Sequence, residues 1–298
     1  MKYTYKSLGL IALSFMILFL TACSEKYNFE FENQSTLLVV EGKITNQAGP
    51  YYVRLSESIK EVIKPNYTGS DKMISKPIAN AQVSLTDDAG DTETLRYIGK
   101  IPGIYPESEG WYIIENMTGV VGRTYTLNIA WDDKTYTATD KMEAVPEIDK
   151  IGFRTKHLAA KNEDVDIPLI YFKEPQGIKN YYLMYFSENG FFGSNRNWAF
   201  SILNDDYLDA YVNGLEIDDG QSPSGRDFYM FISEGTKVDV YLESLSESGY
   251  EFYRGIINQF DADGGAFSSN PSSPPTNVSG VAQGFFRASA VSVKSVIK

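Results

Sequence analysis

The chain has 298 residues and a formal net charge of −12, because 39 Asp and Glu residues outnumber 27 Lys and Arg residues. Such an acidic surface repels nucleic acid and anionic lipid headgroups, which argues against nucleic-acid binding and against membrane attachment through basic residues. The chain has one cysteine, so no internal disulfide can form and the fold must be stabilised by its hydrophobic core.

The first 22 residues have the pattern of a secretion signal. Lys2 and Lys6 give a positive start, and an apolar run of thirteen residues follows from Leu8 to Leu20. A membrane-spanning helix needs roughly 20 apolar residues, so this run predicts a leader rather than an anchor. Removing residues 1–22 with their two lysines would change the net charge from −12 to −14.

The single cysteine, Cys23, follows this leader directly. The stretch LTAC that ends at Cys23 resembles the lipobox of bacterial lipoproteins, in which the cysteine is acylated after the leader is removed. Two acyl chains hold a protein to a membrane far more firmly than one. We therefore expect Cys23 to be lipidated, and the polar residues 23–36 to form a tether between the lipid and the folded part.

Strand patterns begin after the tether. Residues 37–45 and 51–58 are rich in β-branched and aromatic residues and are separated by a turn cluster, which predicts a β-hairpin. Residues 80–98 repeat this design around a turn rich in Asp and Gly. Both patterns predict antiparallel strands.

The clearest strand pattern lies at residues 124–130. Tyr125, Leu127 and Ile129 alternate there with Thr and Asn, so one face of the strand is predicted to be buried and the other solvated. Strand patterns recur about every ten residues, with turn residues between them, which is typical of a sandwich. Residues 37–145 are therefore predicted to form an N-terminal β-sandwich.

Residues 146–298 are predicted to form a second β-sandwich. Pro146 interrupts strand pairing at the expected junction, and further strand patterns follow. They lie at residues 148–155, 166–175, 179–188, 196–203, 226–233, 236–246 and 281–297, the last being one strand or a pair. The fold class is thus mainly β, with two sandwich domains.

One amphipathic helix is predicted near residues 249–260. Ser248 and Glu251 fit a capping box at its start. An apolar stripe then follows, formed by Phe252, Tyr253, Ile256, Ile257 and Phe260. We expect this helix to pack on an open end or face of the second sandwich.

Several segments together resemble a known family. They include LLVVEGKITNQAGPYYVRLSES at residues 37–58, PIANAQVSLTDDAGD at 77–91 and YEFYRGIINQ at 250–259. With two further segments, at 119–149 and 277–291, they resemble the Bacteroidota outer-membrane lipoproteins known as domain of unknown function 4249 over about residues 35–293. The resemblance implies an immunoglobulin-like or carboxypeptidase-regulatory-like first sandwich. It also implies an outer-membrane protein often encoded beside TonB-dependent receptors, and it carries over no catalytic residues.

Catalytic and metal-binding patterns are weak. A histidine-based zinc site or a Ser-His-Asp triad would have to use His157, the only histidine, and no GxSxG motif is present. His157 is expected to be a solvated surface side chain. Acidic clusters occur at 87–91, 205–206, 218–219 and 261–263, and we expect them to be turn residues. The sequence therefore predicts no enzyme, no metal site and no cofactor.

An aromatic loop is the candidate contact surface. Phe191, Phe192 and Trp198 lie among Gly, Asn and Ser residues, which favour an exposed loop. Exposed adjacent aromatic side chains suit contact with a partner protein or a sugar ring. The alternative is that this loop folds back on the core.

These features favour a non-enzymatic lipoprotein of the outer membrane, an accessory or binding subunit of a TonB-dependent transporter or a similar surface complex. Anchoring in the surface-exposed leaflet is favoured over a periplasmic orientation. One alternative is a stand-alone glycan-binding module, for which Trp111, Trp131 and Trp198 are the rings to test. The other is a structural adhesin or pilus-like subunit, in which residues 27–33 could add a strand to a neighbour's sheet.

Overall fold

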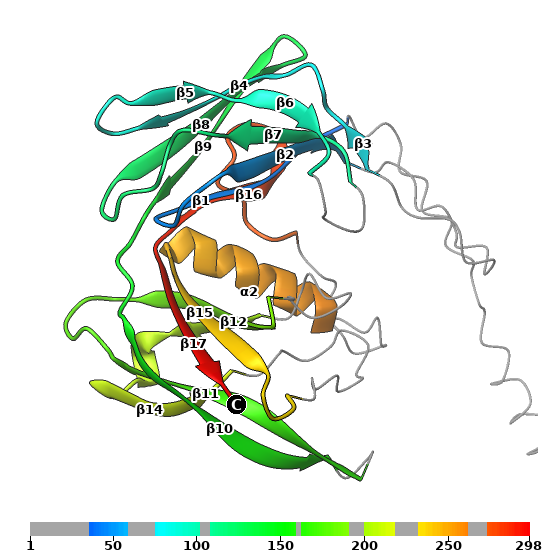
Figure 1. Cartoon of the computed structure of the whole chain (residues 1–298). Coiled ribbons are helices and arrows are strands. Elements are labelled where there is room, and N and C mark those ends of the chain that lie inside the picture. The colour runs from blue at the N-terminus through cyan, green and yellow to red at the C-terminus, as the bar shows by residue number, and fades with distance from the viewer. Residues whose placement is uncertain are drawn as a thin grey trace, which may run out of the picture. The chain divides into compact units, whose positions relative to one another are not determined.

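Antiparallel sheets dominate the computed structural model (Figure 1), which describes residues 36–58, 75–101, 108–158, 162–190, 200–217, 232–261 and 273–298. Its strands form four sheets within these ranges. The mainly β fold predicted from the sequence is confirmed. The expected lipidation site Cys23, the aromatic loop residues Phe191, Phe192 and Trp198, and residues 226–231 of the strand predicted at 226–233 lie outside the described residues. Ile232 and Ser233, the end of that predicted strand, are described and do not belong to a strand.

Two facing sheets make the first sandwich. One has the order β16-β1-β2-β7-β6, with β3 paired to β2, and the other has the order β5-β4-β8-β9. The bounds are β1 Leu38–Thr45, β2 Tyr51–Glu57, β3 Lys76–Pro77, β4 Gln82–Asp87, β5 Thr92–Thr94, β6 Arg96–Gly99, β7 Trp111–Ile114, β8 Thr124–Trp131, β9 Lys134–Lys141 and β16 Ala282–Ser289. Their inward side chains form one continuous hydrophobic core.

The alternation in β8 produces this burial as predicted. Tyr125, Leu127 and Ile129 are buried in the core, and the Thr and Asn side chains between them point to the outer face. The neighbouring strand β4 buries Val83 and Leu85 in the core in the same way, and the residues between them point outward. Successive side chains of a strand point to opposite faces, so alternation of this kind places one face in the core.

The second pair of sheets lies in the C-terminal half. Three strands have the order β10-β11-β14, and four have the order β13-β12-β15-β17. The bounds are β10 Ile148–Leu158, β11 Glu163–Lys173, β12 Tyr181–Glu188, β13 Ser201–Asn204, β14 Tyr211–Glu216, β15 Lys237–Leu245 and β17 Val291–Ile297, with a short 3-10 helix η1 at Asp205–Tyr207. A second hydrophobic core forms between them, with Phe172, Tyr182 and Val240 fully buried.

Helix α2, Glu247–Asp261, is the helix predicted near 249–260, but the expected cap is wrong. The backbone N–H of Gly249 donates to Oγ of Ser246 at 3.0 Å, so Ser246 rather than Ser248 caps the first turn. The helix begins two residues earlier than the capping-box pattern indicates, and this places Ser248 inside it. Glu251 pairs instead with Arg254.

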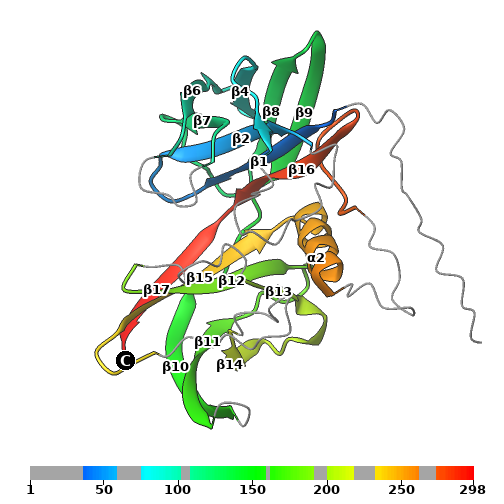
Figure 2. The same cartoon turned by 90° about the vertical axis from the view of Figure 1, so that its right-hand side faces the viewer.

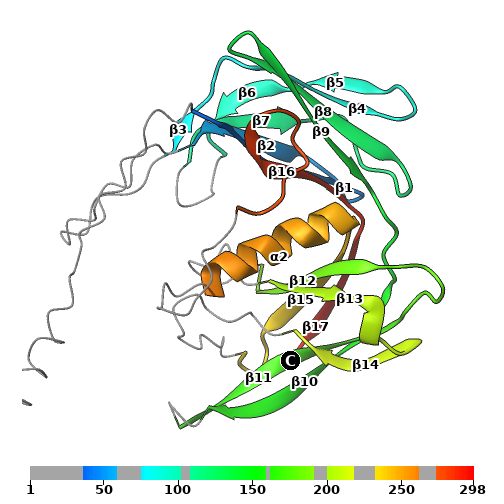
Figure 3. The same ribbon diagram turned by 180° about the vertical axis from the view of Figure 1, so that it is seen from behind.

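The apolar side of α2 packs against both halves of the chain. The helix contacts β12, β13 and β15 of the second sandwich and β16 of the first (Figure 3). The ring of Phe252 stacks on Phe285 of β16, with 5.0 Å between ring centroids. The helix therefore covers a face of the second sandwich and is also tied to the first.

The last two strands join the two sandwiches. Strand β16 pairs in parallel with β1, at the other end of the chain, while β17 pairs with β15. Ala290 alone separates them, so the C-terminal ribbon passes from one sandwich into the other (Figure 2). The sequence predicts that all of residues 146–298 belong to the second sandwich. This boundary is wrong for β16, which completes a sheet of the first sandwich. Residues Thr36–Lys298 form one compact unit.

Side chains close the outer edge of β16. Asn277 donates from Nδ2 to the carbonyl of Phe286 at 2.7 Å and accepts the N–H of Phe286 at 3.1 Å. Oδ2 of Asp140 accepts the N–H of Ala288 at 2.8 Å. These contacts occupy backbone groups of Phe286 and Ala288 where a neighbouring strand would otherwise pair.

Candidate functional site

The acidic cluster at 87–91 has a turn role, as expected, whereas Asp205 and Asp206 lie in η1 and Asp261 ends α2. Oδ1 of Asp87 accepts the N–H groups of Ala89 and Asp91, both at 3.0 Å, and its other oxygen pairs with Arg123. Burial works to raise the pKa of Asp87, but Arg123 and these N–H groups outweigh it, so the pKa lies below its ordinary value. Within the described part of the chain, no group of three or more His, Cys, Asp or Glu residues could hold a metal ion.

His157 is an exposed side chain on β10, as predicted. Its Nδ1 lies 2.7 Å from Oδ1 of Asp164, which faces it across the antiparallel pair of β10 and β11. Both side chains are more than half exposed. A pair in this position is a cross-strand surface contact rather than part of an enclosed site.

The tryptophans of the described ranges do not form a shared platform. Trp111 lies on the outer face of its sheet, edge-on to Tyr52 with 6.4 Å between centroids, and its Nε1 donates to the carbonyl of Ser108 at 3.0 Å. Trp131 packs partly buried against the first core. These two rings belong to different sheets, and Trp198 lies outside the described residues.

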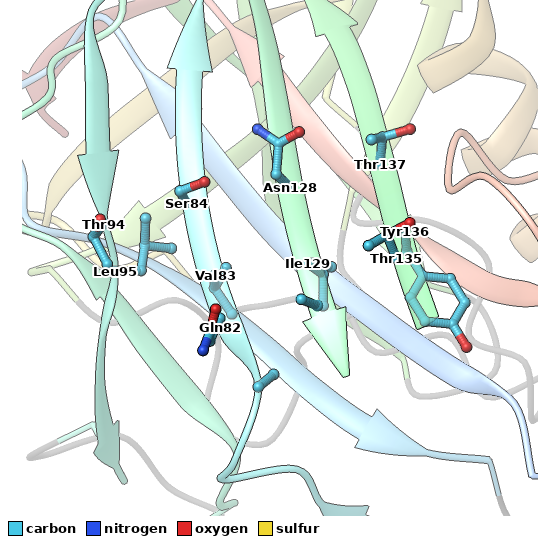
Figure 4. A pocket seen from close by; sticks show the side chains of 12 residues that line it. Gln82, Val83, Ser84, Thr94, Leu95, Asn128, Ile129, Thr135, Tyr136 and Thr137 are labelled. Carbon is cyan, nitrogen blue, oxygen red and sulfur yellow. The ribbon is translucent and has the colours of Figure 1, made fainter. Parts of the chain in front are cut away.

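A hollow of about 540 Å³ lies against the sheet β5-β4-β8-β9 (Figure 4). It is lined by Ala81, Gln82, Val83, Ser84, Thr94, Leu95, Asn128, Ile129, Ala130, Thr135, Tyr136 and Thr137. Register explains how these residues come together. Ser84 of β4 faces Thr94 on one neighbouring strand, β5, and Asn128 on the other, β8. Asn128 in turn faces Thr137 of β9. One row of polar side chains therefore crosses four strands.

Small side chains explain why the sheet surface is hollow there. Ala130 stands between Gln82 and Thr135 in the next row, and Ser84 is the small member of the first row. The side chains of Gln82, Ser84 and Thr94 make no hydrogen bond to another described residue. Their hydroxyl and amide groups are thus available as donors and acceptors for a bound molecule.

The lining of the hollow is uncharged although the chain is strongly acidic. It includes hydroxyl, amide and apolar groups, and it lacks any carboxylate, imidazole, amine or thiol among the described residues. Such a neutral polar lining suits reversible contact with a neutral polar molecule.

A second polar cluster is buried between β16, β15 and β12. Nη2 of Arg287 lies 2.5 Å from Oε2 of Glu243, and Lys43 reaches the other carboxylate oxygen at 3.5 Å. Tyr185 donates to that same oxygen at 2.5 Å. Burial works to raise the pKa of Glu243, but the charges of Arg287 and Lys43 outweigh it, so the pKa is lowered. Both members of the ion pair are nearly inaccessible to solvent, so the cluster has a structural role.

Asp140 adds a second buried carboxyl group near this cluster. Burial is the main cause that raises its pKa to about 6, and hydrogen bonds from Ser246 and from the backbone of Ala288 offset only part of that effect. The charge of Arg287 also lowers it. Ser246 caps α2 and Ala288 belongs to β16, so Asp140 ties the end of β9 to both elements.

These features define a mainly β protein built from facing sheets and one helix, with a neutral surface hollow and a buried ionic centre. The family known as domain of unknown function 4249 (DUF4249) matches residues 24–295, and the chain belongs to this family. The match covers the whole described fold up to Ser295 and begins directly after Cys23. No curated protein matches the chain. No helix in the described ranges is long and apolar enough to cross a membrane.

Proposed function

We propose that this protein is a non-enzymatic lipoprotein of the outer membrane, held by acyl chains on Cys23, that serves as an accessory subunit of a TonB-dependent transporter. The leader and the lipobox-like stretch ending at Cys23 support the anchor. The resemblance noted above to lipoproteins encoded beside such receptors supports the partner. The acidic chain would depend on its acyl chains rather than on basic residues for attachment.

The neutral hollow on the sheet β5-β4-β8-β9 is the observation that supports a binding role. Its row of Thr94, Ser84, Asn128 and Thr137 offers hydrogen-bonding groups without a titrating side chain. Such a surface can hold a cargo molecule and release it unchanged, which an uptake accessory has to do. Its volume of about 540 Å³ falls within the range typical of small-molecule sites.

A stand-alone glycan-binding module is the second candidate function. It is favoured by the same hydroxyl and amide lining, because sugars are neutral and rich in hydroxyl groups. The separation of Trp111 from Trp131 counts against it, since glycan modules commonly stack sugars on a flat group of rings.

The test is a mild-detergent pull-down of the tagged, full-length protein from its own outer membrane, followed by mass spectrometry. Recovery of a TonB-dependent receptor at near-equal abundance is the expected result. A protein that comes down without a receptor would contradict the accessory role, and a glycan array would then test the second candidate.

The anchor has a separate test in Cys23→Ala, which removes the thiol that would be acylated. The variant is expected in the soluble fraction, whereas the wild-type protein sediments with the outer membrane. Ser24→Ala, at the neighbouring position, is the matched control and should still sediment. If Cys23→Ala also sediments with the outer membrane, the anchor is refuted.

A further inference from the structure

Strand β17 lies at the end of its sheet and has a neighbouring strand on one side. Among the described residues it pairs with β15 alone, and the sheet order β13-β12-β15-β17 ends with it (Figure 2). Val293 is 41% exposed and Ile297 is 62% exposed. Side chains two residues apart on a strand share a face, so both flank Ser295 on one surface. We call the unpaired side of residues 293–297 the β17 edge.

Hydrogen bonds beside the two ends of β17 show which backbone groups face this edge. The carbonyl of Ala290 accepts the N–H of Ser244 at 2.9 Å, and the N–H of Lys298 donates to the carbonyl of Thr236 at 3.1 Å. Even-numbered residues thus direct their backbone groups toward β15. Backbone groups of successive residues point to opposite sides of a strand, so the odd-numbered residues of 293–297 direct theirs to the β17 edge. These groups make no hydrogen bond to another described residue.

The start of the same edge is closed, whereas the rest is open. The N–H of Val291 donates to Oδ1 of Asn46 at 2.8 Å, and its carbonyl accepts from Nε2 of Gln47 at 3.0 Å. Farther along, Lys294 is the one charged side chain of β17, and lysines often guard strand edges. Its Nζ donates to the carbonyl of Ile148 at 3.1 Å, so the ammonium group is held against the start of β10. The β17 edge is therefore an unguarded template for another strand.

The side chains along the β17 edge match those of a second copy of the same edge. Two identical strands related by a two-fold axis pair in antiparallel fashion, and the residue on the axis faces itself. An axis at Ser295 sets Val293 opposite Ile297 of the second copy. It also sets Lys294 opposite Val296 of the second copy. Every odd-numbered residue meets an odd-numbered one, so the free N–H and carbonyl groups bond each other.

Charges and occupied backbone groups exclude the neighbouring registers. An axis one residue earlier would set the two copies of Lys294 opposite each other, and an axis one residue later would set Lys294 opposite Lys298. Like charges directly opposite each other are destabilising. An axis two residues earlier would need the backbone groups of Val291, which are already bonded. The axis at Ser295 avoids all of these conflicts.

We propose that two copies of this protein pair through the β17 edge, so that two four-stranded sheets join across an axis at Ser295. The acidic chains repel each other, but at physiological salt this repulsion is screened beyond about 8 Å. The pairing uses a sheet separate from that of the hollow and does not depend on the accessory role.

Disulfide trapping of the full-length protein in its own cells tests the register. Ser295→Cys puts a thiol on the axis, where paired Cα atoms lie about 5.5 Å apart, within reach of a disulfide. Val293→Cys is the matched control, because its two thiols would lie roughly 14 Å apart along the strands. Mild oxidation is expected to give at least about tenfold more cross-linked dimer with Ser295→Cys than with Val293→Cys or the wild type. Combining Val293→Cys with Ile297→Cys should restore the cross-linked dimer.

A proline at position 295 tests the backbone pairing without a cross-link. Ser295→Pro removes the N–H that faces the second copy and leaves the hydrogen bonds to β15 intact. Ser295→Ala is its matched control, since both variants lose the hydroxyl that donates to Asp239 and alanine keeps the N–H. Sedimentation of the purified full-length proteins in mild detergent should show dimers for the wild type and Ser295→Ala, and a monomer for Ser295→Pro.

Several results would overturn the pairing. Equal cross-linking of Ser295→Cys and Val293→Cys would mean that copies meet without this register. Equal masses of the wild type and Ser295→Pro, or no cross-linked dimer with Ser295→Cys, would also refute it. If Ser295→Pro does not fold, the cysteine variants decide. All of these results leave the accessory role standing, because the receptor pull-down tests that role separately.

Discussion

Asp140 is the side chain whose charge state should matter most near neutral pH. Its folded-state pKa of about 6 lies above the ordinary Asp value of 3.8, so the folded protein binds this proton more tightly than the unfolded chain does. The stabilisation is fully present below the unfolded-state pKa and is lost as pH rises through about 6. Above that pH, Asp140 is a buried carboxylate that opposes folding.

Asp140→Asn should therefore change how stability depends on pH. The amide can still accept from Ala288, and it carries no buried charge at neutral pH. The wild type loses this stabilisation when the pH is raised from 4.5 to 7.5, and the variant does not. The difference in free energy of unfolding, variant minus wild type, is therefore expected to be about 2 kcal/mol larger at pH 7.5 than at pH 4.5. Urea unfolding at the two pH values measures this difference.

Asp209→Asn is the matched control, since it removes an exposed carboxylate. If Asp140→Asn differs from the wild type by the same amount at both pH values, the buried-carboxylate explanation fails.

Sequence patterns could not single out Asp140. Its burial depends on Ser246 and β16, which come together with it only in the folded chain.

At the scale of elements, alternation predicted strands well. Tyr125, Leu127 and Ile129 are buried as expected, because a solvated strand face and a buried face leave a local pattern. The position of β16 leaves no such pattern, since its partner β1 is distant in the sequence and pairs with it in parallel. The capping-box pattern places the cap of α2 at Ser248 instead of Ser246, because the two serines are equally good capping residues.

Gly284 tests the pairing of β1 with β16. Its φ is +90°, and a Cβ there would lie 1.9 Å from the carbonyl oxygen of Val40. Gly284→Ala is expected to cost at least about 3 kcal/mol in the free energy of unfolding, because backbone strain and a clash with β1 add together. Urea unfolding followed by circular dichroism measures it.

Gly90→Ala separates strain from the clash. Gly90 has a φ of +94°, but a Cβ there would meet nothing within 4 Å. Its substitution should cost only about 1 kcal/mol. Equal losses for the two variants would show that the close approach of β1 to β16 contributes nothing.

At the scale of the whole molecule, the two sandwiches share the C-terminal ribbon and the buried pair of Arg287 and Glu243. Arg287 lies on β16 of the first sandwich, and Glu243 on β15 of the second. Separating the sandwiches would break this pair, and a charge that stayed buried without its partner would be strongly destabilising. Sequence patterns divide the chain at Pro146 because proline interrupts strand pairing and a new strand pattern follows, but they do not reveal this ionic link.

The two sandwiches should therefore unfold in one cooperative step. Hydrogen-deuterium exchange in increasing urea should show peptides from β8 and from β12 losing protection at the same urea concentration. Peptides covering the exposed turn at Asp132–Asp133 should exchange without protection at every urea concentration and serve as the reference for unprotected amides. Protection that persists in β12 after β8 has lost it would mean that the halves are independent.

The parallel pairing of β1 with β16 also sets an order of events for a new chain. A ribosome completes Leu38–Thr45 long before it makes Ala282–Ser289, yet the two strands are neighbours in the finished sheet. Until β16 is made, one edge of β1 stays unpaired, and an unpaired strand edge can pair wrongly. The nascent protein thus has to be kept from premature association until β16 emerges, whatever compartment it folds in.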